Sequence, residues 1–138
     1  MPTTINGPRA ILVAEDSAEQ RALYVDVLTR AGYRVLQAGD GVEPLASIHR
    51  ERPDLVLMDV TMPGTSGWNV VRAMREDLAT RDIPIIVVTG LSARWDRDAS
   101  IAAGCDAYLS KPVAPRRLLD EVRKLLRPNP LFPLEDES

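Results

Sequence analysis

The chain lacks several features that mark other protein classes. One cysteine, Cys105, stands among 138 residues. An internal disulfide is therefore excluded, and we expect a reducing, cytoplasmic location. No apolar segment is long enough to cross a bilayer, and residues 1–8 have neither the charge nor the apolar stretch of a signal peptide. The net charge is −3 with the signs interspersed, so we expect neither nucleic acid nor a membrane as a partner.

Lysine and histidine are also scarce. Only Lys111 and Lys124 stand against fifteen arginines, and His49 is the one histidine. An ammonium group is a compact point charge, whereas guanidinium is a wide fork. Because lysine is scarce and Lys111 lies between an apolar run and Pro112, we expect Lys111 to be present for the chemistry of its ammonium group. His49 has no second histidine or cysteine nearby, so the sequence predicts a solvated side chain and not a metal ligand.

What the chain does have is a regular alternation of two patterns. Near-continuous apolar runs of this length are typical of strands buried on both faces of a parallel sheet. Amphipathic, helix-like segments separate them. The alternation predicts a doubly wound α/β fold. The apolar runs are Ala10–Ala14, Arg34–Ala38, Leu55–Met58, Pro84–Thr89 and Ala107–Ser110, and the helical segments are Ala18–Ala31, Val42–Arg50, Trp68–Leu78, Ala93–Ala103 and Pro115–Arg127.

Local signals set the bounds of these elements. Ser17 and Gln20 have the spacing of a capping box for the first helix, and Gly32 is placed to end it. Pro115 suits the first turn of the last helix. The expected organisation is one domain over residues 9–127, an extension at 1–8, and a tail at 128–138 that is first proline-rich and then acidic.

Polar residues follow four of the five apolar runs. Glu15-Asp16 follows the first run, Asp59 the third, Thr89 ends the fourth, and Lys111 follows the fifth. Because ligands of open α/β sheets bind beyond the carboxyl ends of the strands, we expect these side chains to meet. Two carboxylates about 4 Å apart at an effective dielectric of about 20 repel by roughly 4 kcal/mol. Lys111 offsets part of that repulsion.

The remaining charge predicts a metal. Oxygen ligands without histidine or cysteine select a hard cation, Mg²⁺ or Mn²⁺, which commonly binds beside a phosphate. Asp59 is the candidate nucleophile, since carboxylates can form aspartyl-phosphate intermediates. Thr89 and Lys111 offer a hydroxyl donor and a cation to the phosphoryl oxygens.

The ordered set of motifs resembles the receiver domain of two-component response regulators, from Arg9 to about Arg127. The matching residues are Glu15-Asp16, Asp59, Met62-Pro63 with Gly67, Thr89-Gly90, Tyr108 and Lys111-Pro112. The resemblance implies a flavodoxin-like (βα)5 fold with a five-stranded parallel sheet of order 2-1-3-4-5. It also implies a cis peptide bond between Lys111 and Pro112.

The resemblance further implies a role for each acidic residue. Asp16, Asp59 and the backbone carbonyl of Thr61 would bind Mg²⁺ directly, and Glu15 would act mainly through water. Asp59 would accept a phosphoryl group from a phosphohistidine on a sensor histidine kinase or a histidine phosphotransfer protein.

It also implies how phosphorylation would be sensed. Thr89 and Lys111 would contact the phosphoryl group, and movement of Thr89 would let Tyr108 turn inward. The face made by the fourth helix, fifth strand and fifth helix would then change, for a downstream protein or for homodimerisation. We expect a stand-alone signalling module without substrate turnover, because no DNA-binding or catalytic output domain follows.

Several alternatives remain open. The chain could be a phosphorelay intermediate, or a receiver-like scaffold that has lost phosphorylation. A haloacid-dehalogenase-like phosphatase with an aspartate nucleophile would need a second aspartate where Thr61 stands. A flavodoxin is disfavoured because Glu15-Asp16 would repel the flavin phosphate. Gly39-Asp40-Gly41 looks like the start of a nucleotide-binding loop, but Pro44 replaces its last glycine, and an isolated match of this kind is weak.

Overall fold

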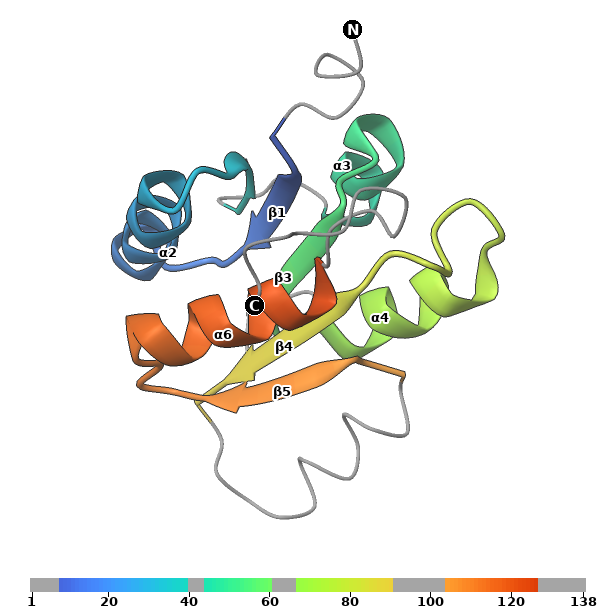
Figure 1. The fold of residues 1–138 in the computed structure, drawn as a ribbon. Helices are drawn as coiled ribbons and strands as arrows, with labels where there is room; N and C mark the ends of the chain where they lie inside the picture. The colour runs from blue at the N-terminus through green and yellow to red at the C-terminus, as the bar shows by residue number, and fades with distance from the viewer. Residues whose placement is uncertain (1–7, 40–43, 61–66, 91–103, 127–138) are drawn as a thin grey trace, which may run out of the picture.

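Five parallel strands form the centre of the protein (Figure 1). The computed structural model describes residues 8–39, 44–60, 67–90 and 104–126. The strands pair in the order β2-β1-β3-β4-β5, which confirms the doubly wound, flavodoxin-like fold and its predicted strand order. Their bounds are β1 Ala10–Ala14, β2 Arg34–Ala38, β3 Leu55–Asp59, β4 Ile85–Thr89 and β5 Ala107–Ser110.

Helices cover both faces of this sheet. Side chains of α2 and α6 pack on one face, and side chains of α3 and α4 pack on the other. The predicted helix Ala93–Ala103 lies outside the described residues. The helix bounds are α2 Ala18–Arg30, α3 Pro44–Glu51, α4 Gly67–Glu76 and α6 Pro115–Leu125.

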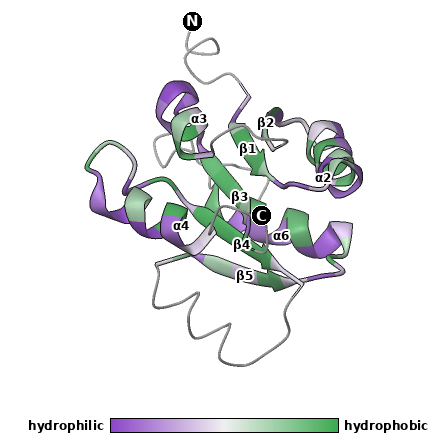
Figure 2. Ribbon diagram, turned by 180° about the vertical axis from the view of Figure 1, so that it is seen from behind, coloured by the Kyte–Doolittle hydropathy of each residue, from purple (hydrophilic) through white to green (hydrophobic). Residues whose placement is uncertain are grey.

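The apolar runs become strands because both of their faces are covered. Every residue of β1, β3 and β4 is buried, and these strands are the hydrophobic centre seen in Figure 2. Successive side chains point to opposite faces, so each strand contributes to two separate cores. Leu12 packs with α3 and α4, and Ile11 packs with α2 and α6. Burial on both sides explains the near-continuous apolar sequence.

Ser17 caps α2, and Gly32 and Pro115 mark helix ends, as predicted, but the reciprocal half of the capping box is not formed: the amide of Ser17 donates to Glu15 Oε2 at 3.0 Å. The Ser17 hydroxyl accepts a hydrogen bond from the amide of Gln20 at 3.3 Å. Gly32 adopts φ 100° just after α2, a left-handed conformation that glycine takes without a Cβ penalty. Pro115 opens α6. The two helices are one and two residues shorter than predicted, ending at Arg30 and Leu125.

Helix α4 ends at Glu76, two residues before the predicted Leu78. The backbone leaves the helix because side chains take over its hydrogen bonds. Asp77 accepts from the amide of Ala79 at 2.9 Å, and the buried Thr80 hydroxyl donates to the carbonyl of Met74 at 2.9 Å. Leu78 is left 78% exposed.

One arginine fastens the amino-terminal edge of the sheet. Arg75 donates to the carbonyls of Gly104, Arg81 and Ile83 at 2.8 Å each, and to the Asp106 carboxylate at 2.6 Å. These acceptors precede β4 and β5, so a single guanidinium joins α4 to the starts of both strands. Bonds that involve a charged group are stronger than neutral ones.

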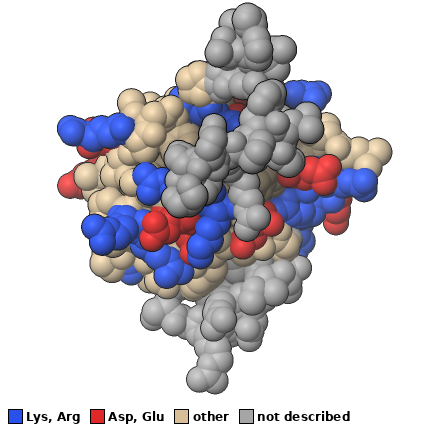
Figure 3. Space-filling view, in the orientation of Figure 1, with Lys and Arg blue, Asp and Glu red and all other residues tan. Residues whose placement is uncertain are grey.

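The surface carries both signs of charge. On the face drawn in Figure 3, acidic and basic side chains of the described residues lie side by side, as the interspersed sequence predicts. Within the residues that the structure describes, no helix is long and apolar enough to span a bilayer.

Candidate functional site

The carboxyl ends of the strands bring four predicted site residues to one edge. Glu15 follows β1, Asp59 is the last residue of β3, Thr89 is the last of β4, and Lys111 follows β5. Backbone bonds continue past the strand ends: the amide of Lys111 donates to the carbonyl of Thr89 at 2.8 Å. The side chains that follow neighbouring strands are thereby held at the same edge of the sheet.

Lys111 joins two of the acidic residues. Its ammonium donates to Asp59 Oδ2 at 2.8 Å and lies 3.3 Å from Glu15 Oε1. The second approach is an ion pair without hydrogen-bond geometry, since Glu15 Oε1 has no hydrogen-bond partner. The side chains of Glu15 and Asp59 are only 3% and 4% exposed, and that of Lys111 is 18% exposed. The three charges therefore interact with little screening by solvent.

Burial and mutual proximity shift the ionisation of this group. Desolvation, followed by the close approach of the Asp59 carboxyl group, raises the pKa of Glu15 above its usual value. For Lys111, burial acts to lower the pKa, but the contacts with Asp59 and Glu15 outweigh it and raise the pKa. The lysine therefore stays charged, and one of the two carboxylates is held at an energetic cost.

The residues present fit a hard divalent cation. Two carboxylates and one ammonium leave one negative charge, and Glu15 Oε1 is a buried acceptor without a hydrogen bond. Asp16, the next residue along the chain after Glu15, is exposed and offers another oxygen. All of these donors are oxygens, the ligands that Mg²⁺ prefers. Among the described residues no three acidic, histidine or cysteine side chains already converge as a metal cluster, and Thr61 lies outside the described part.

The two predicted switch residues occupy different depths. Thr89 is fully buried at the end of β4. Tyr108 in β5 is partly buried, pairs in register with Val87, and packs against the core on the α3 and α4 face. The peptide bond between Lys111 and Pro112 is cis, as the resemblance implied. Met62 and Pro63 lie outside the described residues.

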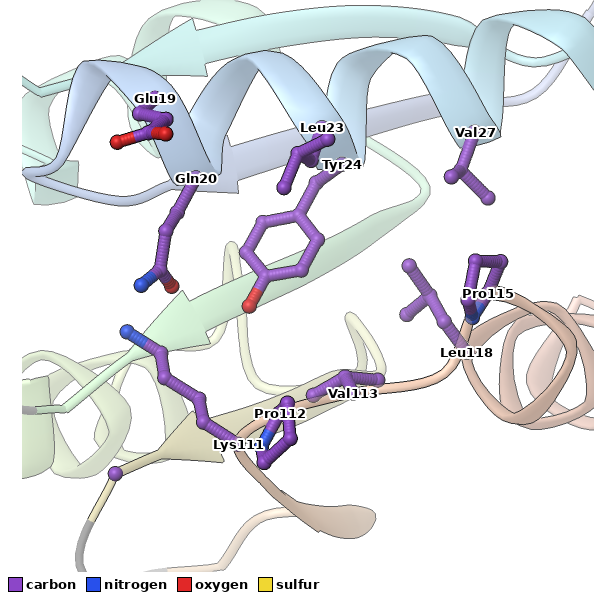
Figure 4. Close-up of a pocket in the computed structure, with 11 residues that line it drawn as sticks. Glu19, Gln20, Leu23, Tyr24, Val27, Lys111, Pro112, Val113, Pro115 and Leu118 are labelled. Atoms are coloured by element: carbon purple, nitrogen blue, oxygen red, sulfur yellow. The ribbon is translucent and has the colours of Figure 1, made fainter.

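A pocket of about 630 Å³ opens next to the site (Figure 4). Its walls come from α2, from Gly90 after β4, from the segment between β5 and α6, and from the start of α6. Lys111 and Gln20 lie at one end, and apolar side chains, including Leu23 and Tyr24, line the rest. Leu23 is 61% exposed. Burial raises the pKa of the Tyr24 hydroxyl, while the charge of Lys111 acts in the opposite direction.

Three further residues shape the site. The resemblance had already named Gly67, whereas sequence reasoning did not assign Arg21 and Gly39 to the site. A Cβ on Gly67 would lie 2.7 Å from the Cα of Val60, so α4 packs directly on the backbone that follows Asp59. Arg21 donates to the backbone carbonyl of Glu15 at 2.8 Å, and Gly39 leaves room for that contact. A glycine beside a strand end was the only available signal, and it also fits a simple turn.

Comparison with known proteins agrees with the fold and the strand-end pattern. The sequence-family model for the response regulator receiver domain matches residues 11–123, and the chain belongs to this family. The polar-differentiation response regulator DivK of Brucella anthropi is 32% identical over 119 residues, which cover 86% of this chain and 97% of that protein.

Solved structures give the same result. The chemotaxis protein CheY4 of Vibrio cholerae has a TM-score of 0.80 and 31% identity, covering 87% of this chain and 100% of that one. The receiver domain of the sensor histidine kinase PA1611 from Pseudomonas aeruginosa PAO1 has a TM-score of 0.78 and 30% identity, covering 86% and 98%. That structure contains a magnesium ion coordinated in its active-site cleft.

Proposed function

We propose that this receiver domain accepts a phosphoryl group from a phosphohistidine onto Asp59 and signals through protein contacts. The observation that carries the proposal is the buried contact of Asp59 with Lys111, 2.8 Å long, at the carboxyl end of the central strand β3. An aspartate used only for structure would gain little from burial beside a second carboxylate, because like charges in a poorly screened site repel.

In the proposed reaction, a carboxylate oxygen of Asp59 attacks phosphorus, a P–O bond forms, and the P–N bond to the donor imidazole breaks. Lys111 places a positive charge beside the carboxylate, where it would stabilise the phosphoryl oxygens. Thr89 would donate its hydroxyl to the same oxygens. Glu15, Asp16, Asp59 and the carbonyl of Thr61 would hold Mg²⁺, which when bound supplies charge neutralisation to the phosphoryl group.

The proposed output involves the face that includes β5, α6 and the predicted helix Ala93–Ala103. Phosphorylation adds a dianionic group that can bias a two-state element. Tyr108 in β5 is partly buried, so a change in its burial would alter this face. The proposed partners are a histidine kinase or phosphotransfer protein upstream, and a protein target or a second copy of this chain downstream.

The direct test is intact-protein mass spectrometry after incubation with Mg²⁺ and a small phosphodonor such as acetyl phosphate or phosphoramidate. The wild type should gain one phosphoryl group and Asp59→Asn should gain none. Asp26→Asn is the matched control, because Asp26 is an exposed aspartate on α2 that bonds Arg30, and it should be phosphorylated like the wild type. Equal labelling of Asp59→Asn would refute the assignment.

The same samples separate the alternatives. A scaffold without phosphorylation would gain no mass even with its cognate donor, and a phosphatase would turn over p-nitrophenyl phosphate catalytically. A phosphorelay intermediate would pass its phosphoryl group to a second phosphotransfer protein, whereas a terminal effector would retain it until hydrolysis. A pull-down with phosphorylated wild type against Asp59→Asn would identify the target.

A further inference from the structure

Arg21 holds the backbone of the loop that carries the two predicted acidic ligands. It lies in the first turn of α2, and its Nη1 donates to the carbonyl of Glu15 at 2.8 Å. Its Nε donates to the side chain of Gln37 in β2 at 3.2 Å. One guanidinium therefore connects the end of β1, the start of α2 and the neighbouring strand.

This contact acts on the position of Asp16. The Glu15 carbonyl belongs to the peptide unit whose nitrogen is that of Asp16, and a peptide unit is planar. The amide of Glu15 is held as well, because it donates to the carbonyl of Ala38 at 3.1 Å. Both polar groups of the Glu15 backbone are thus fixed, one by β2 and one by α2.

The neighbouring residue leaves space for the same contact. A Cβ on Gly39 would collide with Nη1 of Arg21 and would lie 2.5 Å from the Glu15 carbonyl oxygen. No larger side chain can stand at position 39 while Arg21 keeps this bond. The glycine, the arginine and the carbonyl oxygen therefore form one packed unit beneath the acidic loop.

We propose that Arg21 is a positioning residue for the cation site: it presets the Glu15–Asp16 loop so that both carboxylates meet the metal without a costly rearrangement. The inference rests on the proposed function, since it assumes that this loop binds Mg²⁺. The Arg21 side chain bonds a backbone carbonyl of the loop and no reacting group. We therefore expect Arg21 to affect the metal affinity and not the chemical step. Partners that orient metal ligands are commonly worth 10–100-fold in affinity.

The test is calorimetric titration of Mg²⁺ alone into the unphosphorylated full chain. Arg21→Ala should weaken Mg²⁺ binding about tenfold. Arg21→Lys should also weaken it, because a lysine lacks the planar fork that reaches both acceptors. Gly39→Ala should act in the same direction by displacing the guanidinium. Arg30→Ala is the matched control, since Arg30 is an exposed arginine of the same helix that bonds Asp26, and it should bind like the wild type.

A second readout separates positioning from catalysis. At saturating Mg²⁺, the rate at which acetyl phosphate phosphorylates Arg21→Ala should return to within about twofold of the wild-type rate. Wild-type Mg²⁺ affinity in Arg21→Ala or in Arg21→Lys would overturn the inference, and so would a rate that stays low at saturating Mg²⁺. If the wild type itself bound no Mg²⁺, the proposed function would fail first, so the two failures are distinguishable.

Discussion

At the scale of single residues, the acidic site combines groups that destabilise one another in the absence of a cation. Glu15 and Asp59 are both buried, and they share one ammonium group. Part of the folding free energy is therefore given up to keep two carboxylates together, which is common at functional sites.

Replacement of Glu15 by glutamine should separate stability from metal binding. Without metal, Glu15→Gln should raise the stability by about 1 kcal/mol, or roughly 3–5 °C in melting temperature. The side-chain oxygen of the new glutamine can still accept the hydrogen bond that the backbone amide of Ser17 donates to Glu15 Oε2 at 3.0 Å. Addition of Mg²⁺ should then raise the melting temperature of the variant less than that of the wild type. Differential scanning fluorimetry would measure both effects.

The control for this variant is Glu76→Gln, which changes an exposed glutamate at the end of α4. It should leave both melting temperatures unchanged. A lower metal-free melting temperature for Glu15→Gln would show that the attraction between Glu15 and Lys111 exceeds the repulsion between the carboxylates.

The sequence predicts a solvated His49. The side chain is indeed exposed, but it also forms two specific contacts. Its Nε2 lies 2.8 Å from Asp77 Oδ2, and its Nδ1 lies 3.0 Å from the carbonyl of Leu45. Both neighbours are acceptors, so both ring nitrogens carry protons when both bonds form. The bond to Asp77, then the bond to the Leu45 carbonyl, raises the pKa of His49. The bond to His49, then that from the Ala79 amide, lowers the pKa of Asp77.

The stabilisation by this pair should depend on pH with a defined sign. A histidine whose pKa is raised on folding adds stability that is complete below its unfolded value of about 6.5 and is lost as pH rises through the folded value. The lowered pKa of Asp77 keeps its own contribution intact above about pH 4. The melting temperature of the wild type minus that of His49→Gln should therefore be largest near pH 5–6 and should shrink by pH 9. A difference that grows with pH would contradict this account. Asp77→Asn should weaken the dependence without removing it, because the Leu45 carbonyl still raises the pKa of His49.

At the scale of elements, Gly67 fixes how closely α4 approaches β3. A methyl group there would meet the Cα of Val60 at 2.7 Å and its Cγ1 at 2.9 Å, and backbone cannot give way as a flexible side chain can. Gly67→Ala should cost about 1–3 kcal/mol in unfolding free energy, measured by urea denaturation. Gly90→Ala is the matched control, because its nearest contact would be Lys111 Cδ at 3.9 Å, and it should stay within about 0.5 kcal/mol.

The elements themselves were largely predictable. Buried strands such as Ile85–Thr89 have a near-continuous apolar sequence, and Gly32 and Pro115 mark helix ends by backbone rules that depend on few neighbours. The end of α4 was predicted two residues late. The Thr80 hydroxyl donates a hydrogen bond to the Met74 carbonyl, and the hydrophobic periodicity of the sequence does not reveal such a contact.

The candidate site was predictable in part for a similar reason. The carboxyl ends of parallel strands share one edge, so order along the chain was enough to bring Asp59 and Lys111 together. Arg21 was missed because its target is a backbone carbonyl, and every residue has one. The pairing of His49 with Asp77 was missed because it joins segments that lie 28 residues apart.

At the scale of the whole molecule, the sheet separates two hydrophobic cores. Met74 of α4 belongs to the core on one face, and Leu118 of α6 belongs to the core on the other. Both side chains are almost fully buried. Truncation of either should leave a cavity that the other cannot relieve.

Met74→Ala and Leu118→Ala should each cost about 2–5 kcal/mol. The two losses should add within about 0.5 kcal/mol in the double variant, because the side chains share no cavity. Urea denaturation of the single and double variants would measure the coupling. A coupling above 1 kcal/mol would show that strain passes through the sheet, and Met74→Leu, which conserves volume, should cost little.

Arg75, which joins α4 to the starts of β4 and β5, has a practical consequence for the construction of a sensor from this protein. Its four bonds stiffen the amino-terminal edge of the sheet, opposite the edge that carries the carboxylates. Leu78 protrudes beside that end, so a cysteine introduced there would couple the protein to a chip or a dye. The reactive edge would then face the bulk solution, open to its donor.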